Sequence, residues 1–396
     1  PGGRARAVYY KDTILDNGQH LLSGAYTETL SLLSSLHSIP PLIRMPLRLN
    51  IDNHVNFRIL NLPSPLHAAS GMFLAKGLPF IGKLKAFNLI KNLRQSKYTS
   101  GKTVQEWLEN QDRTINEQFF FPLCLALLNT PADQADATIF KRVLIDTLAG
   151  PHSATDLLFP TDDLTALFAT PIIHTLRSLG NKVMVGTRIQ SIKRHPEGFE
   201  LFYGKSSIRA QHLILACDAP QSSRLLDTLG GHTNLSRQIQ SIPHQPLITV
   251  YLQYPETVSL SQPMLGFTKK IVNWLFDHGR LRGKKGLIAA VTSNAIHSQQ
   301  YSLPAIAKAI SKELSQNLGL PLQPLWYKAI HEKQATFLAI PGLNRPEHKT
   351  HDPLLWLAGD YIAGPYPATI EAAVQSGLKC AECIRLKTGT PYATYS

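Results

Sequence analysis

The sequence of 396 residues has few cysteines, few charged residues and no long apolar run. Four cysteines in this length give no disulfide framework, which favours a reducing compartment. Because no apolar run is long enough for a membrane span and no signal peptide is recognisable, we expect a protein that lies on a membrane without crossing it. A hydrophobic content of 43% against 17% charged residues is typical of a globular protein, long enough for two domains.

Acidic residues are absent from Asn53 to Gln105. The basic residues of this acid-free stretch are Arg58, Lys76, Lys83, Lys85, Lys91, Arg94, Lys97 and Lys102. Apolar residues recur among them at roughly helical spacing, namely Phe80, Ile81, Leu84, Phe87, Ile90 and Leu93. With a net charge of +13, this pattern predicts a basic amphipathic element on anionic lipid. Nucleic acid is the rival partner, but no binding motif accompanies the charge, and a solvated basic helix is the other alternative.

A Gly-rich GxGxxG fingerprint is also absent, because the pairs Gly2-Gly3 and Gly230-Gly231 lack its spacing. The chain opens instead with Pro-Gly-Gly-Arg. Gly2 and Gly3 permit close approach of backbone to a ligand, and Arg4 supplies a guanidinium fork for phosphate. A glycine turn with solvated arginines is the alternative.

A strand and a helix are predicted near the carboxyl end. The apolar run 354–358 ends in Gly359-Asp360, which indicates a buried strand followed by a carboxylate. Pro367 suits the first turn of a helix. The following apolar and mostly small face consists of Ile370, Ala373, Val374, Gly377, Leu378 and Ala381. Such a unit could bind a polar, partly anionic ligand, or be ordinary strand–loop–helix packing. Cys380 and Cys383 form a CxxC within this helix, where core packing is favoured over metal or redox chemistry.

This arrangement resembles the C-terminal flavin motif of the amine oxidase and phytoene desaturase superfamily. The resemblance implies FAD as the cofactor and no metal. It implies that Asp360, after Gly359, binds the ribityl chain or pyrophosphate, and that the helix start at Ala368, Thr369 and Ile370 faces the flavin pyrimidine. A helix dipole stabilises an anion there by roughly 0.3–1 kcal/mol.

The same resemblance extends to two other parts of the sequence. The segment Gly2-Gly3-Arg4 matches a GGR segment whose arginine contacts the pyrophosphate, and the backbone at Ile189 matches a position that meets the adenine. In the superfamily a Gly-rich fingerprint precedes the GGR segment by roughly 30 residues. We therefore expect either a fragment of a longer protein or the loss of part of the cofactor site. The chain as given is expected to bind FAD weakly unless the upstream βαβ unit is restored.

Longer strings resemble the hydroxysqualene dehydroxylases of bacterial hopanoid biosynthesis, a group within this superfamily. They are residues 16–30, 122–131, 137–150, 154–168 and 273–279. The resemblance implies FAD-dependent reductive dehydroxylation of hydroxysqualene, a long-chain isoprenoid, to squalene. It also implies a cytoplasmic protein at the inner face of the membrane, with squalene-synthase-like enzymes as candidate contacts and no nucleic acid. A carotenoid or phytoene-type desaturase, another prenoid flavin oxidoreductase, and a flavin-less lipid- or partner-binding remnant remain alternatives.

The proton donor of this reaction is not identified by the sequence. Asp16, Gln19 and His20 are candidate catalytic residues, because the corresponding family segment runs beside the isoalloxazine ring. Asp277 and His278 are further candidates. The alternative for the first three is a hairpin turn with satisfied polar side chains.

The fold class expected is α/β: a glutathione-reductase-type FAD domain lacking its first Gly-rich βαβ unit, interleaved with an α+β substrate domain of mixed sheet and helical cap. The FAD-binding domain is expected to comprise 1–52, 150–235 and 344–396, and the substrate or membrane-facing domain 53–149 and 236–343. Strands are expected at 7–10, 13–15, 182–185, 188–192, 199–203, 207–209, 212–217, 247–253, 286–292 and 326–337. Helices are expected at 103–128, 139–148, 171–179 and 305–318.

Overall fold

The computed structural model describes residues 1–36, 38–52, 54–63, 66–95, 99–268, 270–293 and 302–389. Asn53 and Lys97 of the acid-free stretch lie outside these residues. The chain divides into two compact units. Unit 1 comprises Pro1–Thr175 and His244–Pro341, and unit 2 comprises Leu176–Pro243 and Gly342–Ser396.

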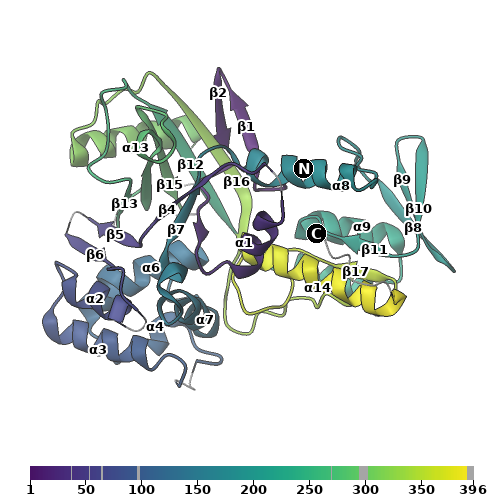
Figure 1. Ribbon diagram of the computed structural model, residues 1–396, viewed down its shortest axis with the longest axis horizontal. Coiled ribbons are helices and arrows are strands. Elements are labelled where there is room, and N and C mark those ends of the chain that lie inside the picture. The colour runs from purple at the N-terminus through teal and green to yellow at the C-terminus, as the bar shows by residue number, and fades with distance from the viewer. Residues whose placement is uncertain are drawn as a thin grey trace. The chain divides into compact units, whose positions relative to one another are not determined.

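Unit 1 is built on a seven-stranded sheet (Figure 1). Its strands, in spatial order, are β16 (Trp326–Phe337), β12 (His244–Gln253), β15 (Leu287–Thr292), β14 (Trp274–Asp277), β13 (Met264–Gly266), β5 (Arg48–Ile51) and β6 (Val55–Arg58). All neighbours are antiparallel except β13 and β5, which are parallel. The mixed sheet expected from the sequence is confirmed.

The helix α13 (Leu303–Leu318) covers part of this sheet and confirms the helix expected there. Ser302 begins it by accepting a hydrogen bond from the backbone N–H of Ala305, and Gly319 ends it in the left-handed conformation. The buried face of the helix packs with apolar residues of β12 and β15 in one core, which includes Ile306, Ile310, Leu314, Val250, Leu252, Ile288 and Ala290. Burial of these side chains is what holds the helix on the sheet.

Two smaller sheets complete the strands of unit 1. β1 (Ala7–Tyr10) and β2 (Thr13–Asp16) form the expected hairpin. A three-stranded antiparallel sheet follows, in the order β3 (Leu22–Ser23), β7 (Leu157–Pro160), β4 (Leu42–Met45).

The remaining helices up to residue 178 are short. They are α1 (Thr27–Ser34), α2 (Leu66–Leu74), α3 (Phe80–Lys91), α4 (Val104–Trp107), α5 (Arg113–Ile115), the π-helix η1 (Asn116–Phe120), α6 (Phe121–Leu128), α7 (Ala137–Leu148), the 3₁₀ helix η2 (His152–Thr155), the π-helix η3 (Thr165–Ala169) and α8 (Thr170–Ser178). A further helix, α11 (His278–Arg282), follows β14. None of the described helices has the length and apolar content needed to cross a bilayer.

The single helix expected over 103–128 is wrong. Thr103 and Glu106 form a capping box that begins α4, and the Asp112 carboxylate then accepts from the backbone N–H of Ile115 to begin α5. Two N-caps nine residues apart start two separate helices, because each cap fixes a non-helical residue before its first turn. The polar residues that interrupt the pattern are therefore capping residues.

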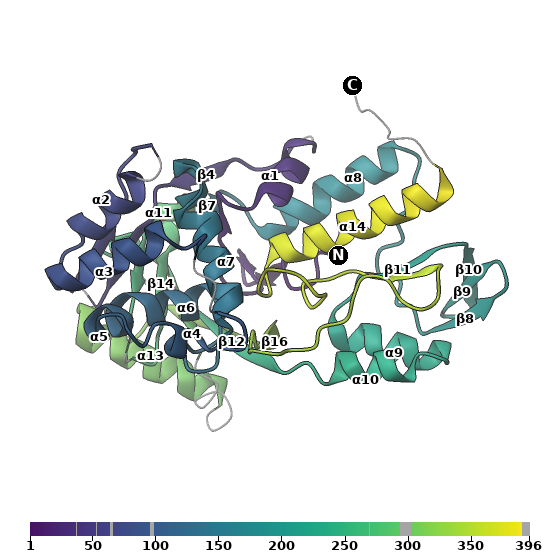
Figure 2. The same cartoon turned by 90° about the horizontal axis from the view of Figure 1, so that it is seen from below.

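Unit 2 contains a three-stranded meander, a parallel strand pair and three helices (Figure 2). The meander is β8 (Ser191–His195), β9 (Gly198–Tyr203) and β10 (Ser206–Ala210), and the parallel pair is β11 (Leu213–Leu215) and β17 (Leu355–Leu357). The helices are α9 (Ala219–Leu229), α10 (Thr233–Gln240) and α14 (Ile370–Thr388). The predicted meander is confirmed, and the parallel strand expected over 212–217 is present as β11, where Leu213 and Leu215 are buried and Ile214 is 37% exposed.

Two boundaries in unit 2 differ from the prediction. Residues 181–190 form no regular strand, so the strands expected at 182–185 and 188–192 are replaced by a single strand that begins at Ser191. The helix expected from Pro367 begins at Ile370, because the Thr369 side chain accepts from the backbone N–H of Ala372 and takes the N-cap position.

The two units follow a different division from the domains expected by function. Residues 1–52 and 150–175, which we expected in the FAD-binding domain, make most of their contacts within unit 1. Compact units are defined by packing, whereas the expected domains are defined by ligand, so the functional division stays a prediction.

Candidate functional site

In unit 2, the carboxyl ends of β11 and β17 meet at one edge. The backbone N–H of Ala358 donates to the Leu215 carbonyl (2.9 Å), and that of Gly359 donates to Ser376 Oγ on α14 (2.7 Å). Gly359 has a φ of +152°, and a Cβ there would lie 2.7 Å from the Tyr361 ring. Only glycine fits this turn, which brings the chain from the strand toward α14.

Asp360 follows this glycine and is only 8% exposed. Next to it, Tyr361 is buried and donates its hydroxyl to Ser222 Oγ (2.9 Å). Burial raises the pKa of Tyr361, so the phenol stays protonated and keeps that hydrogen bond. The predicted carboxylate after the strand is therefore present and shielded from solvent within unit 2; its contact with a cofactor stays a prediction.

The N-terminus of α14 is built as the sequence predicts apart from its first residue. Thr369 Oγ1 caps the backbone N–H of Ala372 (3.1 Å), and the residues Ala368, Thr369 and Ile370 are half-buried. A helix of 19 residues presents backbone donors and a positive dipole end at this point. These groups suit the anionic part of a ligand.

The CxxC of α14 packs in the core of unit 2. Cys380 is fully buried beside Trp356 and Ala358, and its Sγ donates to the Leu357 carbonyl (3.1 Å). Burial raises the pKa of Cys380 to about 11, which leaves the thiol protonated and unreactive. Across the described ranges, no group of three or more His, Cys, Asp or Glu side chains could hold a metal ion.

Ile189, the expected adenine contact, lies just before β8. Arg224 of α9 donates to the carbonyls of Ile189 (Nη2, 3.0 Å) and Gln190 (Nη1, 2.9 Å). The arginine therefore fixes this irregular backbone from one side. The role of Ile189 toward adenine stays a prediction.

In unit 1, the N-terminal segment forms a turn. Gly2 and Gly3 have φ values of +90° and +57°, and the backbone N–H of Ala5 donates to the Gly2 carbonyl (2.9 Å). Nη1 of Arg4 donates to the carbonyls of Ala335 (2.6 Å) and Gln334 (3.3 Å) on β16. Arg4 is thus anchored to a strand, and its contact with a pyrophosphate stays a prediction.

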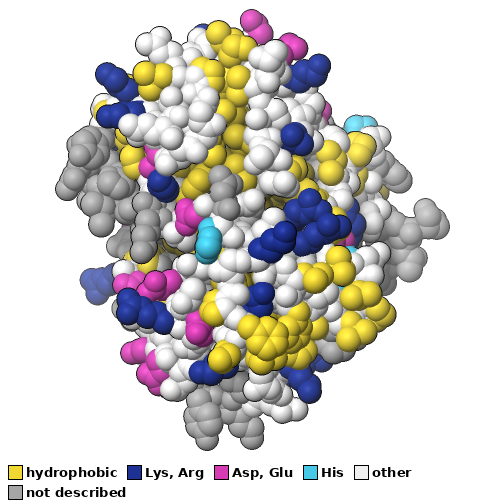
Figure 3. Space-filling model, turned by 90° about the vertical axis from the view of Figure 1, so that its left-hand side faces the viewer, with side chains coloured by type: hydrophobic (Ala, Val, Ile, Leu, Met, Phe, Trp, Pro, Cys, Tyr) yellow, Lys and Arg dark blue, Asp and Glu magenta, His cyan; other side chains and the backbone are white. Residues whose placement is uncertain are grey.

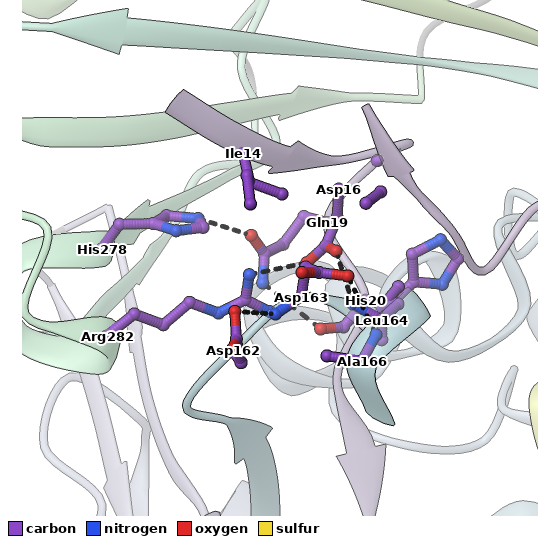
Figure 4. A network of polar contacts seen from close by, with 12 residues as sticks. Ile14, Asp16, Gln19, His20, Asp162, Asp163, Leu164, Ala166, His278 and Arg282 are labelled. Carbon is purple, nitrogen blue, oxygen red and sulfur yellow. Dashed lines mark hydrogen bonds and ion pairs between the residues drawn. The ribbon is translucent and has the colours of Figure 1, made fainter. Parts of the chain in front are cut away.

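Asp16, the first of the candidate catalytic residues, is part of a buried ion pair (Figure 4). Its Oδ2 lies 2.6 Å from Nη1 of Arg282, with both side chains at most 2% exposed. The other carboxylate oxygen accepts a hydrogen bond from the backbone N–H of Leu164 (2.8 Å). The backbone carbonyl of Asp16 accepts one from the Tyr251 hydroxyl (3.1 Å). Because both carboxylate oxygens already accept hydrogen bonds, Asp16 joins several elements and is poorly placed to donate a proton.

Gln19 and His278 meet in the same cluster. Gln19 Oε1 lies 2.9 Å from His278 Nε2, so the ring nitrogen is the donor (Figure 4). Burial, followed by the charges of Arg282 and Lys284, holds the pKa of His278 well below its ordinary value. His278 is therefore a neutral hydrogen-bond donor that orients Gln19.

His20 completes the candidate segment. Burial lowers the pKa of His20, against the opposing effect of Asp16, and the charges of Arg4 and Arg282 lower it further. The imidazole is therefore neutral at pH 7 and carries one N–H donor.

The other candidate, Asp277, has a structural position. Its Oδ1 accepts from the backbone N–H of Arg280 and caps α11, while Oδ2 accepts from Ser259 Oγ and the backbone N–H of Leu260. Both oxygens are therefore engaged in holding the turn that carries His278.

Sequence reasoning missed three members of this cluster: Tyr251, Arg282 and Lys284. Lys284 Nζ donates to the Ile14 carbonyl (2.6 Å), and burial followed by Arg282 lowers the pKa of this lysine. The signal was the dense basic run 280–285 directly after an apolar strand. The structure brings this run to β2 through the ion pair of Arg282 with Asp16 and the hydrogen bond of Lys284 to Ile14.

The sequence model of the family described as flavin containing amine oxidoreductase matches residues 1–385. The chain belongs to this family. The family confirms the oxidoreductase class and the flavin cofactor, FAD, expected from the sequence.

Relatives with known names are distant. A hydroxysqualene dehydroxylase of Sinorhizobium fredii is 25% identical over 70% of this chain, and one of Zymomonas mobilis is 23% identical over 96% of this chain and 90% of its own length. A 15-cis-phytoene desaturase of an Oncidium hybrid is 23% identical over 71% of this chain and 52% of its own length. The matched part spans 64% of the Sinorhizobium enzyme and 62% of its Rhodopseudomonas palustris counterpart. These names support the superfamily expected from the sequence.

Solved structures agree on the fold. Cyclohexylamine oxidase from Brevibacterium oxydans is similar with a TM-score of 0.70 at 16% identity, covering 98% of this chain and 91% of that one. An oxidoreductase from Methanosarcina mazei gives 0.73 at 13% identity, covering 96% and 91%. The α/β class is confirmed, and the glutathione-reductase type of the expected FAD domain stays a prediction.

Each unit, taken by itself, has features that suit part of a flavin dinucleotide. Unit 2 offers the N-terminus of the 19-residue helix α14, a shielded carboxylate at Asp360, and a turn at Gly359 that has no side chain. Unit 1 offers Gly2 and Gly3, both exposed and in conformations that favour glycine. Each feature is one that a phosphate-bearing cofactor needs.

Proposed function

We propose that this flavoprotein catalyses the reductive dehydroxylation of hydroxysqualene to squalene. The observation that carries the proposal is the contact between Gln19 and His278 (2.9 Å), which joins the two segments, 16–30 and 273–279, that resemble hydroxysqualene dehydroxylases. Relatives of that name, at 23–25% identity, support the same choice.

Reduced FAD, when bound, supplies the hydride for this reaction. The carbon–oxygen bond would break, the carbon would receive one hydride, and the hydroxyl would leave as water after taking one proton that comes from solvent, so the reaction consumes two electrons from the reduced cofactor. The residues that would hold the cofactor are Gly2, Gly3, Arg4, Ile189, Gly359, Asp360, Ala368, Thr369 and Ile370.

His20 is the proposed hydrogen-bond donor to the departing hydroxyl. Asp16 is excluded from this role because Arg282 and the Leu164 backbone N–H occupy its two oxygens. Gln19 is held by His278, which leaves the neutral imidazole of His20 as the candidate with a protonated ring nitrogen to offer. Gln19 and His278 act as positioning residues.

A second candidate function is prenoid desaturation, favoured by the relatives named 15-cis-phytoene desaturase. Desaturation removes hydride from the hydrocarbon, so oxidised rather than reduced FAD is the reactant. The two reactions therefore run from opposite redox states of the cofactor, and one assay separates them.

The test is product analysis with purified protein incubated with FAD, with and without the upstream βαβ unit expected from the sequence. We expect squalene from hydroxysqualene under dithionite, and no desaturation of phytoene with oxidised FAD. Desaturated product from phytoene without squalene formation would replace the proposal by the second candidate. A colourless preparation that takes up no FAD in either form would favour the lipid- or partner-binding alternative.

The role of His20 has its own prediction. His20→Ala should lower the rate of squalene formation by about 10²-fold, the usual cost of removing one hydrogen-bond donor from an oxygen that gains negative charge. His20→Gln, which keeps an N–H donor, should retain more of it, while both variants keep the flavin absorption spectrum. Equal rates for His20→Ala and the parent protein would remove His20 from the mechanism.

We also propose that the protein works at the inner face of a membrane, as a peripheral protein. A C30 prenoid with one hydroxyl partitions into lipid, and the acid-free stretch supplies a basic surface. Squalene-synthase-like enzymes are candidate contacts at that surface, because they would handle the same C30 chain. Cell fractionation tests the location, and recovery only in the supernatant would contradict it.

A further inference from the structure

Two arginines face each other on the hairpin of β5 and β6. Arg48 pairs with Arg58 in the antiparallel register, and Asn50 pairs with Asn56 on the same face. The opposite face is apolar and buried, with the side chains Leu49, Ile51, Val55 and Phe57 at most 4% exposed. Like charges directly opposite on neighbouring strands destabilise a sheet. An anion bound between the two guanidinium groups would offset this repulsion.

The two arginines line an open pocket of about 280 Å³. Asn50, Asn56, Asn61 and Gln262 add amide groups to its wall, and no Asp or Glu lines it. Neither arginine forms an ion pair with any residue that the structure describes. The buried Asn50 Oδ1 likewise lacks a hydrogen-bond partner there. The pocket is positive, rich in hydrogen-bonding groups and open to solvent, which suits a phosphate.

The wall of the pocket is in contact with the helix α2. The backbone N–H of Leu60, a wall residue, donates to Ser70 Oγ on α2 (3.0 Å). Gly71 lies against the β6 hairpin, where a Cβ would come within 2.6 Å of the Phe57 ring. Lys76 and Asn56 exchange backbone hydrogen bonds of 3.0 and 3.3 Å. These contacts fix the pocket and α2 as one surface.

Large apolar side chains stand exposed on α2 and α3 beside this pocket. Leu66 and Leu74 are 56% and 55% exposed, and Phe80 and Ile81 are 65% and 69% exposed. Figure 3, which faces the side carrying these helices and β5–β6 in Figure 1, shows hydrophobic side chains gathered close to a group of Lys and Arg side chains. An exposed apolar patch next to basic residues is typical of a surface that enters the headgroup region of a membrane.

The helix α3 also has an acidic neighbour. Asp112 lies against Gly82, but its carboxylate is engaged in capping α5 through the backbone N–H of Ile115 (3.1 Å). The basic side chains of α3 and of the segment before it, Lys76, Lys83 and Lys85, form no ion pair within the described residues. Charge and apolar exposure point to the same partner.

We propose that this face, formed by β5, β6, α2 and α3, docks on a bilayer containing anionic phospholipid, with Arg48 and Arg58 binding a headgroup phosphate. The exposed side chains of Leu66, Phe80 and Ile81 then contact the acyl boundary. The inference deepens the proposed membrane association by naming its site, and it does not depend on which reaction the enzyme catalyses. Nucleic acid fits less well, because three of the four most exposed apolar side chains, Leu66, Leu74 and Ile81, are aliphatic and offer bases no stacking surface.

The test is sedimentation of the whole protein with vesicles of phosphatidylcholine alone or mixed equally with phosphatidylglycerol. We expect binding to the mixed vesicles, and the double variant Arg48→Ala/Arg58→Ala should lower the partition coefficient about tenfold or more. The control Lys205→Ala/Arg237→Ala removes the same charge from exposed positions of unit 2 and should retain most of the binding. Phe80→Ser/Ile81→Ser should weaken binding while leaving the preference for phosphatidylglycerol.

Four results would overturn the proposal. They are equal binding to both kinds of vesicle, an equal loss in the control variant, saturable binding of free glycerol phosphate that vesicles do not compete, and an arginine-dependent affinity for oligonucleotides that exceeds the affinity for vesicles. Circular dichroism of each variant checks the fold. Because no turnover is measured, failure of the assignment to hydroxysqualene leaves this result unaffected.

Discussion

Unit 1 contains two sets of arginine side chains with opposite surroundings. Arg282 is 2% exposed and contacts Asp16 at 2.6 Å, whereas Arg48 and Arg58 are exposed and face each other across a hairpin. The buried guanidinium is shielded from water and paired with a carboxylate, so its charge stabilises the fold around the segment 16–20. The exposed pair remains solvated and no Asp or Glu lines its pocket, so its charge remains available to a ligand. Position, rather than residue type, separates the two roles.

The energetic consequences differ in the same way. A buried ion pair is costly to desolvate, and removing one partner leaves an uncompensated charge in the interior. An exposed arginine is solvated before and after a mutation, so its removal changes the folded state little. Stability measurements on the two sets should therefore diverge.

The largest effect is expected for Arg282→Met. It leaves the Asp16 carboxylate buried without its cation, and should lower the free energy of unfolding by roughly 3–5 kcal/mol. Urea denaturation measures this, with Arg280→Met as the matched control, since Arg280 is half-exposed beside Asp277 and should cost about 1 kcal/mol or less. The double variant Asp16→Asn/Arg282→Met should recover part of the loss. A change in Arg282→Met no greater than in the control would show that the two arginines are equivalent.

A smaller effect is expected from pH. The folded-state pKa values of His278 and His20 lie below the ordinary value, so the unfolded chain binds more protons in acid. Stability is complete above about pH 6.5 and should fall below it, by up to about 1.4 kcal/mol per pH unit for each such histidine. His278→Gln, which cannot be protonated, should flatten the decline between neutral pH and pH 5. An unchanged slope would mean that His278 titrates normally beside Arg282.

The smallest effect is expected for the exposed pair. Arg58→Ala should change the free energy of unfolding by about 0.5 kcal/mol or less, with a gain favoured because the cross-strand repulsion from Arg48 disappears. Thermal unfolding of Arg58→Ala and Arg58→Lys, with the second retaining the repulsion, measures the difference. A loss as large as that of Arg282→Met would indicate that the exposed pair has a structural role after all.

Local patterns in the sequence predicted much of unit 2. The run before Asp360 is uniformly apolar because β17 is buried, and such runs are recognisable without tertiary information. The helix after it was displaced by three residues, since Pro367 and Thr369 are both good starting residues and only the capping bond to Ala372 decides between them. The single helix expected over 103–128 failed for the same reason, at Asp112.

Only one side of the candidate site was predicted from the sequence. The segment 16–20 was recognised through its resemblance to a family, but the partner of Asp16 lies 266 residues further along the chain. No periodicity links positions that far apart, so Arg282 could not be found before the fold was known. The pair of Arg48 and Arg58 was missed for another reason. Arg48 precedes the acid-free stretch, which begins at Asn53, and it lies opposite Arg58 only because of the register of the hairpin.

In the large sheet of unit 1, β13 and β5 are paired at a single described residue pair, Gly266 and Ile51. The Asp52 carboxylate, which accepts a hydrogen bond from the Thr268 hydroxyl, adds to this junction. The backbone N–H of Asp52 also donates to the Gly266 carbonyl (2.8 Å), and a Cβ on Gly266 would lie 2.8 Å from the Trp274 ring. The β5–β6 hairpin is thus joined to the other strands of the sheet by few backbone contacts. Gly266 therefore lies at the junction that joins β5 and β6 to the remaining strands of the sheet, and a side chain at this position should loosen that junction.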